Sequence, residues 1–399
     1  MASTALKLRA ENDQDLARRI LEDHDVRRVI EKIDEQAEKS ETRRQLLATS
    51  VRLSPRLAPD LHRVMDACKE KLLVSTPLEI FVFPSAQYNA ACVRPEEGRV
   101  FIMFSSELLE AFDNAELAFV AGHELGHHVF DHHSIPVGTL LRTPGAVSPR
   151  IAMKLFTWSR YAEVSADRVG HYCAEDIDAV ARGLFKLASG LREGASAVVM
   201  KELLAQVDDL AAYDAAGADS APRADWFSTH PFSPLRLKAA QLFQGSEHMT
   251  PGGVPPAELE VEVAKLMGIM EPGYLHDKSD AAKLMRRLLL AGAMAVAAAS
   301  KDVSDREIEA IEGFLGEGKV TRTLDVDALR ADLPRRMDAV VEATPPSKRA
   351  HVVRDLCVIA RADGHVDDAE RAVLETIAKG LKIGPEVVPS ILDASLDLD

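Results

Sequence analysis

The sequence predicts a mainly α-helical chain of the α+β class, with one small sheet and an all-α helical bundle at its C-terminal end. Alanine and leucine are frequent while aromatic residues make up only 5%, which favours helices over strands. Two short runs, residues 78–83 (LEIFVF) and 100–104 (VFIMF), are rich in residues that favour strands. The region after residue 256 has helical patterns throughout.

Composition limits the number of domains and the classes of partner. At 399 residues the chain exceeds the size at which a single hydrophobic core stops growing, so several domains are expected. Its formal net charge of -15 argues against nucleic acid as a partner, because phosphate binding needs a basic surface. The four cysteines lie far apart and form no CxxC pair, which is typical of free thiols in a reducing cytosol.

The apolar segments predict no transmembrane helix. The N-terminal residues lack the apolar core of a signal peptide. The most apolar run, Leu288 to Ser300, is shorter than the roughly 20 apolar residues that cross a bilayer, and charged residues flank it. We therefore expect a buried helix at this position and a soluble, cytoplasmic protein.

Four regions are expected along the chain. Residues 1–60 predict a helical arm, because apolar side chains recur at helical intervals in a highly charged stretch. Residues 61–244 combine the two strands with several helices, and the Gly- and Pro-rich residues 245–256 predict a linker. Residues 257–399 predict a helical domain with an internal repeat, in which residues 293–296 align with residues 356–359.

Start signals mark the helices of residues 61–244. The first is expected over residues 61–73. Asp113, with Glu116 three residues later, forms a capping box for a helix that ends near Phe130. Pro149 suits the first position of a second long helix, which ends near Cys173. Further helical patterns cover residues 177–191 and 196–212.

His123, Glu124 and His127 form an HExxH motif on the helix that Asp113 begins. Residues four apart lie on the same helix face, so both imidazoles can reach one metal ion. Zinc lowers the pKa of its bound water towards neutrality, and Glu124 can then accept a proton from that water as general base. The alternative is a helix whose surface histidines bind no metal, since the motif also occurs by chance.

A catalytic zinc needs a third protein ligand and an open position. Glu163, on the second long helix, is the best candidate, which predicts about one zinc ion per chain. Asp167 lies one turn further on the same face and could accept a hydrogen bond from a ligating histidine. The alternative for both acids is an ordinary amphipathic helix with exposed carboxylates.

These residues resemble the M48 metallopeptidases of the CAAX-prenyl-endopeptidase and HtpX type, in which HELGH precedes an ExxxD segment, here Glu163 to Asp167. The resemblance covers residues 60–243. It implies a zincin-type peptidase fold, Glu163 as third zinc ligand and a polypeptide substrate. Many members are membrane enzymes, whereas this chain is more similar to the soluble branch, which implies a bacterial cytosolic protein.

Two segments outside the motif add to the resemblance. Asn89 lies in a Tyr-Asn-Ala-Ala segment, and His230 and Arg236 lie in the THPFSPLRL segment of residues 229–237. The family pattern implies that these three residues touch substrate or stabilise an oxyanion. The alternatives are a turn residue for Asn89 and surface or salt-bridging roles for His230 and Arg236.

A strand that precedes the zinc helix often binds the substrate backbone in zincins. We therefore expect the strand of residues 100–104, with Ile102 at its centre, to pair with a peptide substrate. The alternative is an internal strand that serves only the core.

The C-terminal residues 280–390 resemble the TerB-like helical domain, through the segments KDVSDREIEAIEGFL and ADGHVDDAERAVLETIA. Helix starts are expected at Ser304 with Glu307 and at Asp367 with Glu370. The acidic loop before Asp367 lacks the spacing of an EF-hand. The resemblance implies an acidic helical bundle that binds a metal or a partner, and the alternative is an accessory bundle without chemistry. Intramolecular regulation of the peptidase is one role open to it.

The sequence as a whole thus predicts a zinc-dependent endopeptidase with Glu124 as general base. Two alternatives stay open. One is a latent or regulated zinc-bearing protein whose helical C-terminal domain acts as a binding or adaptor module. The other is a structural interaction protein whose histidines bind no metal.

Overall fold

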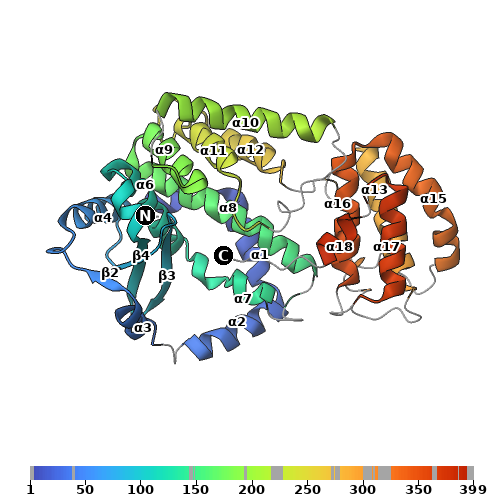
Figure 1. Cartoon of the computed structure of the whole chain (residues 1–399), viewed down its shortest axis with the longest axis horizontal. Coiled ribbons are helices and arrows are strands. Elements are labelled where there is room, and N and C mark those ends of the chain that lie inside the picture. The colour runs from blue at the N-terminus through green and yellow to red at the C-terminus, as the bar shows by residue number, and fades with distance from the viewer. Residues whose placement is uncertain are drawn as a thin grey trace. The chain divides into compact units, whose positions relative to one another are not determined.

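The computed structural model of the chain divides into two compact units (Figure 1). Unit 1 comprises Met1–Pro136, Trp158–Asp208 and His230–Met267, and unit 2 comprises Val137–Thr157, Asp209–Thr229 and Gly268–Asp399. The structure describes residues 4–37, 41–142, 147, 149–192, 196–216, 228–270, 274, 279–299, 308, 311–312, 325–361, 366–384 and 386–392.

The fold is mainly α-helical with one small sheet among the described residues, which confirms the predicted fold class. The elements up to residue 134 are η1 (Thr4–Leu8), α1 (Glu11–Leu21), α2 (His24–Ala37), α3 (Thr42–Thr49), β1 (Val51–Leu53), α4 (Pro59–Leu72), β2 (Leu78–Phe83), β3 (Ala90–Glu96), β4 (Arg99–Ser105), α5 (Ser106–Ala111), α6 (Asn114–Val129) and η2 (His132–Ser134). They are followed by α7 (Val137–Arg142), α8 (Pro149–Ala174), α9 (Ile177–Ser189), α10 (Ser196–Ala216), α11 (Ser233–Gln244) and α12 (Pro256–Met267).

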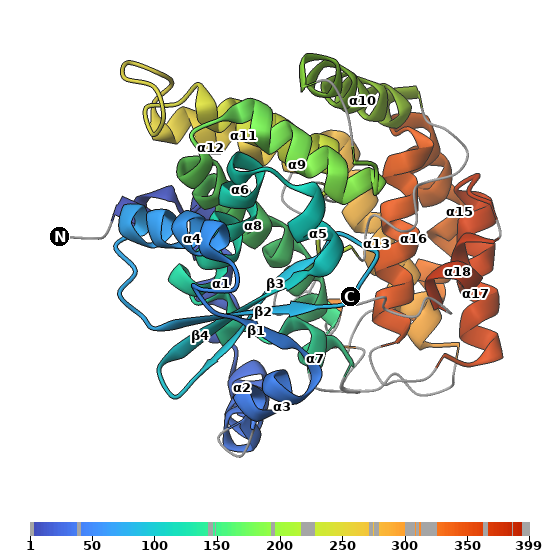
Figure 2. The same cartoon turned by 60° about the vertical axis from the view of Figure 1, so that its left-hand side comes forward.

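The sheet has the strand order β1-β2-β4-β3 (Figure 2). The two predicted strands, β2 and β4, lie in the middle and pair in parallel, with Ile80 opposite Ile102. Strands β1 and β3 were not predicted, and each pairs antiparallel at one edge. Neither has the continuous apolar run that predicts a buried strand. Strand β1 has only three residues, and β3 contains Pro95, which is typical of an edge strand.

The position of β4 corrects the expectation that its central residue binds substrate. Strand β4 has a hydrogen-bonded neighbour on each side, so its backbone has no free edge for a peptide. Ile102 is fully buried. The near-continuous apolar run of β4 is typical of a central strand that is covered on both faces. The alternative reading, an internal strand that serves only the core, therefore applies.

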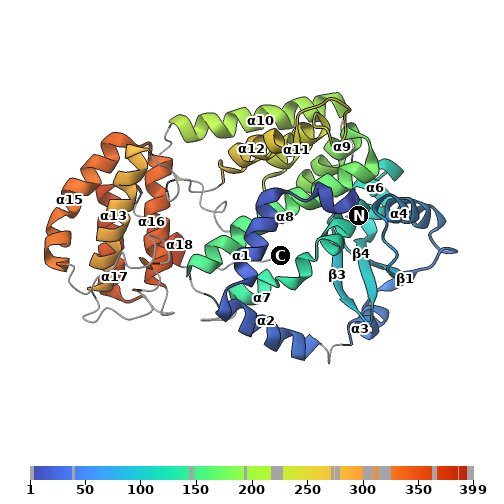
Figure 3. The same cartoon turned by 180° about the vertical axis from the view of Figure 1, so that it is seen from behind.

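The helices of the predicted N-terminal arm belong to unit 1. Ile20 of α1 and Val26 of α2 are fully buried within unit 1. Helix α1 runs beside α8, and the backbone N–H of Ala10 donates to Ser165 of that helix at 3.0 Å (Figure 3). Unit 1 also contains residues 245–256, where a linker is expected, and helix α12. The chain passes into unit 2 after Met267.

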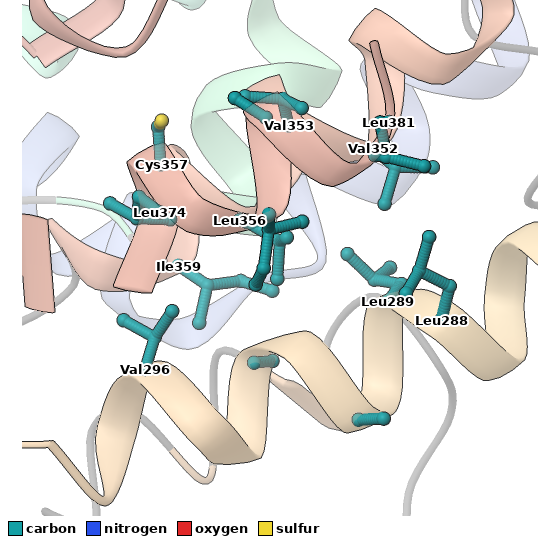
Figure 4. Packing of buried hydrophobic residues seen from close by; sticks show 14 of the residues in the cluster. Leu288, Leu289, Val296, Val352, Val353, Leu356, Cys357, Ile359, Leu374 and Leu381 are labelled. Atoms are coloured by element: carbon teal, nitrogen blue, oxygen red, sulfur yellow. The ribbon is translucent and has the colours of Figure 1, made fainter. Parts of the chain in front are cut away.

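The C-terminal part of unit 2 is a helical bundle of α13 (Asp280–Ala297), α15 (Val326–Ala343), α16 (Pro346–Ala360), α17 (Asp368–Gly380) and α18 (Val387–Leu392). The apolar run that begins at Leu288 is buried in α13, as predicted, and packs against α16 (Figure 4). At Gly292 a Cβ would lie 3.0 Å from the Leu356 side chain, so glycine permits this close helix contact.

The predicted capping box at Asp367 and Glu370 is present at the start of α17. Ser304, Glu307 and the loop of residues 363–365 lie outside the described residues. Among the described helices, none combines the length and the apolar character needed to cross a membrane.

Candidate metal centre

Helix α6, which carries the HExxH motif, begins at a capping box that fixes its register. The Asp113 side chain accepts hydrogen bonds from the backbone N–H groups of Ala115 and Glu116, and the Glu116 carboxylate accepts the N–H of Asp113 at 2.9 Å. Glu116 is itself buried and paired with Lys186 at 2.7 Å. This confirms the predicted helix start. The Glu116–Lys186 pair also fixes the helix two turns before His123, the first histidine of the motif.

Three glycines let α6 and α8 approach closely. A Cβ on Gly122 would lie 2.9 Å from the Cα of Gly170, and a Cβ on Gly126 would lie 3.1 Å from the Cα of Ala166. A Cβ on Gly170 would meet the carbonyl oxygen of Phe119 at 2.5 Å, closer than real Cβ contacts allow. Any larger residue would separate the two helices. The glycines therefore bring the two histidines of α6 within reach of the carboxylates of α8.

Side-chain donors of His123, His127 and Glu163 meet at one point between these helices. The two Nε2 atoms are 3.1 Å apart. Nε2 of His123 is 3.5 Å from one carboxylate oxygen of Glu163, and Nε2 of His127 is 3.4 Å from the other. Ligands about 2.05 Å from a tetrahedral zinc ion are about 3.3 Å from one another. The distance between the two nitrogens, and the distance from each nitrogen to a Glu163 oxygen, are close to this spacing.

Asp167 orients His123. Its carboxylate oxygen lies 2.9 Å from Nδ1 of His123, and Arg236 donates two hydrogen bonds to the same carboxylate at 2.8 and 2.6 Å. Burial alone would raise the pKa of Asp167, but the Arg236 guanidinium outweighs it and the pKa is lowered. An ionised carboxylate only accepts, so the hydrogen of His123 lies on Nδ1 and Nε2 carries a lone pair.

His132 makes the corresponding contact to the second histidine. Its Nδ1 lies 2.9 Å from Nδ1 of His127. Burial lowers the pKa of His132 to about 4, so its ring is neutral near pH 7 and has a single N–H.

The donor set fits a cation. Glu163 is buried, and its Oε2 atom accepts no hydrogen bond from the described residues. Burial would raise the pKa of Glu163, but the nearby His230 and His123 outweigh it and hold the pKa well below the usual range. A buried, ionised carboxylate that faces two imidazole nitrogens is satisfied by a metal ion. Two nitrogens and one oxygen are a ligand set typical of catalytic zinc.

Glu124 lies on α6, next to His123, and its carboxylate is held by a hydrogen bond from strand β3. Its Oε2 atom accepts the backbone N–H of Cys92 in β3 at 2.6 Å, and the side chain is 7% exposed. One carboxylate oxygen is thus fixed against the edge strand. The motif glutamate lies between the donor cluster and β3.

Residues 55–147 and 142–243 match the model of peptidase family M48. The chain carries an M48 peptidase domain. Residues 260–391 match the model of the tellurite resistance protein TerB, so a TerB domain follows the M48 domain in the predicted order.

One curated relative is the plastoglobule-localized metallopeptidase 48, chloroplastic, of Arabidopsis thaliana. It is 31% identical over 153 residues, which are 36% of this chain and 44% of that protein. The match thus spans less than half of the relative. No solved structure matches the chain.

The remaining predicted residues of the M48 domain occupy different positions. His230 is exposed, and its Nε2 lies 3.5 Å from Glu163. Arg236 donates two hydrogen bonds to Asp167, and one of its guanidinium nitrogens lies 3.4 Å from Oε2 of Glu163. Asn89 is exposed just before β3, with its backbone N–H bonded to Ser105 at 3.0 Å. The substrate or oxyanion roles of Asn89, His230 and Arg236 stay predictions.

Sequence reasoning missed His132 and Asp13 as parts of the M48 site. Asp13 of α1 is fully buried and lies 3.0 Å from Nε2 of His132. A signal was present, because Asp13 shares a helix face with the buried Ala17 and Ile20. A carboxylate on the apolar face of an amphipathic helix indicates a buried partner.

Proposed function

We propose that the M48 domain is a zinc-dependent endopeptidase, with the ion held by His123, His127 and Glu163. The observation that carries the proposal is the donor cluster, whose spacing and tautomers suit a tetrahedral ion. The match to peptidase family M48 supports it independently. When bound, zinc would polarise the scissile carbonyl group and lower the pKa of a water molecule.

Glu124 serves as general base in this proposal. Its carboxylate accepts a proton from the attacking water and returns it to the leaving amine. The Cys92 N–H at 2.6 Å holds one oxygen in place, so the other can face the water. His230, exposed and 3.5 Å from Glu163, would donate to the developing oxyanion in this proposal. Arg236 acts through Asp167 and keeps the Nε2 lone pair of His123 directed at the ion.

Zinc should bind at about one ion per chain, and its removal should abolish peptide cleavage. The measurement is metal analysis before and after chelation, with cleavage of a mixed library of unfolded peptides in each state. Re-added zinc should restore cleavage. At free zinc about a thousandfold above Kd, it should also stabilise the folded chain by about 4 kcal/mol. Cleavage that survives complete removal of the metal would contradict the proposal.

The substrate strand is proposed to pair with β3 rather than with β4. Strand β3 is an edge of the sheet, and its Cys92 N–H already contacts Glu124. A peptide that adds to this edge would place its carbonyl groups next to the general base.

N-methylation of substrate amides close to the scissile bond should therefore lower kcat/KM. One backbone hydrogen bond is worth about 1 kcal/mol, so the expected loss is roughly fivefold for each amide that pairs with β3. The measurement is a series of peptides methylated one position at a time. Losses should alternate along the peptide, because successive amides of a strand point to opposite sides. Equal cleavage of all the methylated peptides would rule out strand addition.

A further inference from the structure

A buried carboxylate from the N-terminal helix α1 lies behind the metal centre. Oδ2 of Asp13 accepts hydrogen bonds from Ser165 at 2.7 Å and Arg9 at 2.9 Å, and lies 3.0 Å from Nε2 of His132. Oδ1 accepts from Trp158 at 2.9 Å and from a second Arg9 nitrogen at 2.9 Å. With this many donors around it, the carboxylate is an ionised acceptor whose position is fixed.

The hydrogen bonds of this chain are all donated in one direction, from the metal site towards this carboxylate. Because Asp13 only accepts, Nε2 of His132 carries the hydrogen between them, and a His127 that binds metal through Nε2 carries its own hydrogen on Nδ1. Nδ1 of His132 then carries a lone pair and accepts the hydrogen on Nδ1 of His127. His127 is left with a lone pair on Nε2, the atom 3.1 Å from Nε2 of His123.

The two ligand histidines are therefore oriented by different parts of the chain. Asp167, on the neighbouring helix α8, contacts His123 directly. Asp13 reaches His127 only through His132 and comes from a helix 119 residues earlier in the chain. The first arrangement is intrinsic to the pair of helices α6 and α8. The second exists only while α1 is docked.

We propose that Asp13 is a positioning residue for the metal ligand His127, acting through His132, and that docking of helix α1 is thereby coupled to metal binding. The inference rests on the proposed zinc site. Coupling is reciprocal, so bound metal should hold α1 in place and an undocked α1 should weaken metal binding by the same factor. A carboxylate that served only to anchor the helix would leave metal affinity unchanged.

The test compares the zinc affinity of full-length variants by competition with a chelator. Asp13→Asn keeps the size of the side chain and removes its charge, while His132→Phe keeps a ring and removes both hydrogen bonds. Each should weaken zinc binding by about tenfold to a hundredfold, the usual effect of losing a group that orients a metal ligand. His132→Gln, whose amide can donate to Asp13 and accept from His127, should restore most of the affinity.

Trp158→Phe is the matched control, because it removes a donor from the other oxygen of Asp13, keeps both hydrogen bonds of His132, and retains an aromatic ring at the position that packs edge-on against His132. Its zinc affinity should stay within about threefold of the wild type, even where its thermal stability falls. The visible spectrum of cobalt-substituted protein gives a second readout. It should change in Asp13→Asn and His132→Phe and stay unchanged in Trp158→Phe.

Wild-type affinity in folded Asp13→Asn and His132→Phe would overturn the inference, as would an equal loss in Trp158→Phe. Should Asp13→Asn fail to fold, the contrast between His132→Phe and His132→Gln decides alone. A wild-type chain that binds no zinc would overturn the proposed function together with the inference. That result is distinguishable, because it appears before any variant is compared.

Discussion

Glu124→Gln should lower kcat/KM for peptide cleavage by about a hundredfold to ten-thousandfold while zinc stays bound, the usual contribution of a general base. The amide has nearly the size of the carboxylate, and its oxygen can still accept the Cys92 N–H that the glutamate accepts at 2.6 Å. It cannot take a proton from water. The variant therefore removes one chemical capacity and keeps the geometry.

Cleavage of a mixed peptide library by both proteins checks this expectation, with metal analysis of the same samples. Cleavage by the wild type alone, at equal zinc content, would establish the role of Glu124. Equal cleavage by both would assign the activity to another base or to a contaminating protease. If neither cleaves, the latent or adaptor alternative gains support, and truncation of the TerB domain becomes the next experiment.

His127→Ala should weaken zinc binding by about a hundredfold or more. Zinc sites with four protein ligands bind with about 10–16 kcal/mol, so one ligand contributes about 3 kcal/mol. The loss of Nε2 also leaves the ionised, buried Glu163 with one imidazole fewer near its oxygens. The variant should therefore lose the stabilisation that zinc gives the wild type.

His128→Ala is the control on the same helix. His128 is half-buried and lies 3.3 Å from the Thr76 hydroxyl, away from the donor cluster. Chelator competition and the shift of Tm on zinc addition should be near wild type in this variant. If the two alanine variants lost affinity equally, the assignment of His127 as a ligand would be wrong.

Local patterns were enough to predict the helix that carries the site. Asp113 and Glu116 mark its start, and a spacing of four residues places His123 and His127 on one face. Such signals act within one or two turns, so they can be read without knowing the fold. The third donor, Glu163, came from a family resemblance together with its place on an amphipathic helix. The structure brings its carboxylate to the two imidazoles.

Strand position could not be read in the same way. The runs at residues 78–83 and 100–104 are apolar enough to predict strands, yet their sequence does not say which strand ends at an edge. That depends on pairing with β1 and β3, two strands with weak patterns of their own. The expectation for Ile102 was wrong for this reason.

The sequence by itself determined the chemistry of this protein: an HExxH motif on a capped helix, followed by acids at helical spacing. Only the tertiary structure decided how that chemistry is supported. Arg236 points at Asp167, and Asp13 reaches His127 through His132. These contacts join segments far apart in the chain. Side-chain hydrogen bonds of this kind depend on how the helices dock, and no local pattern encodes docking.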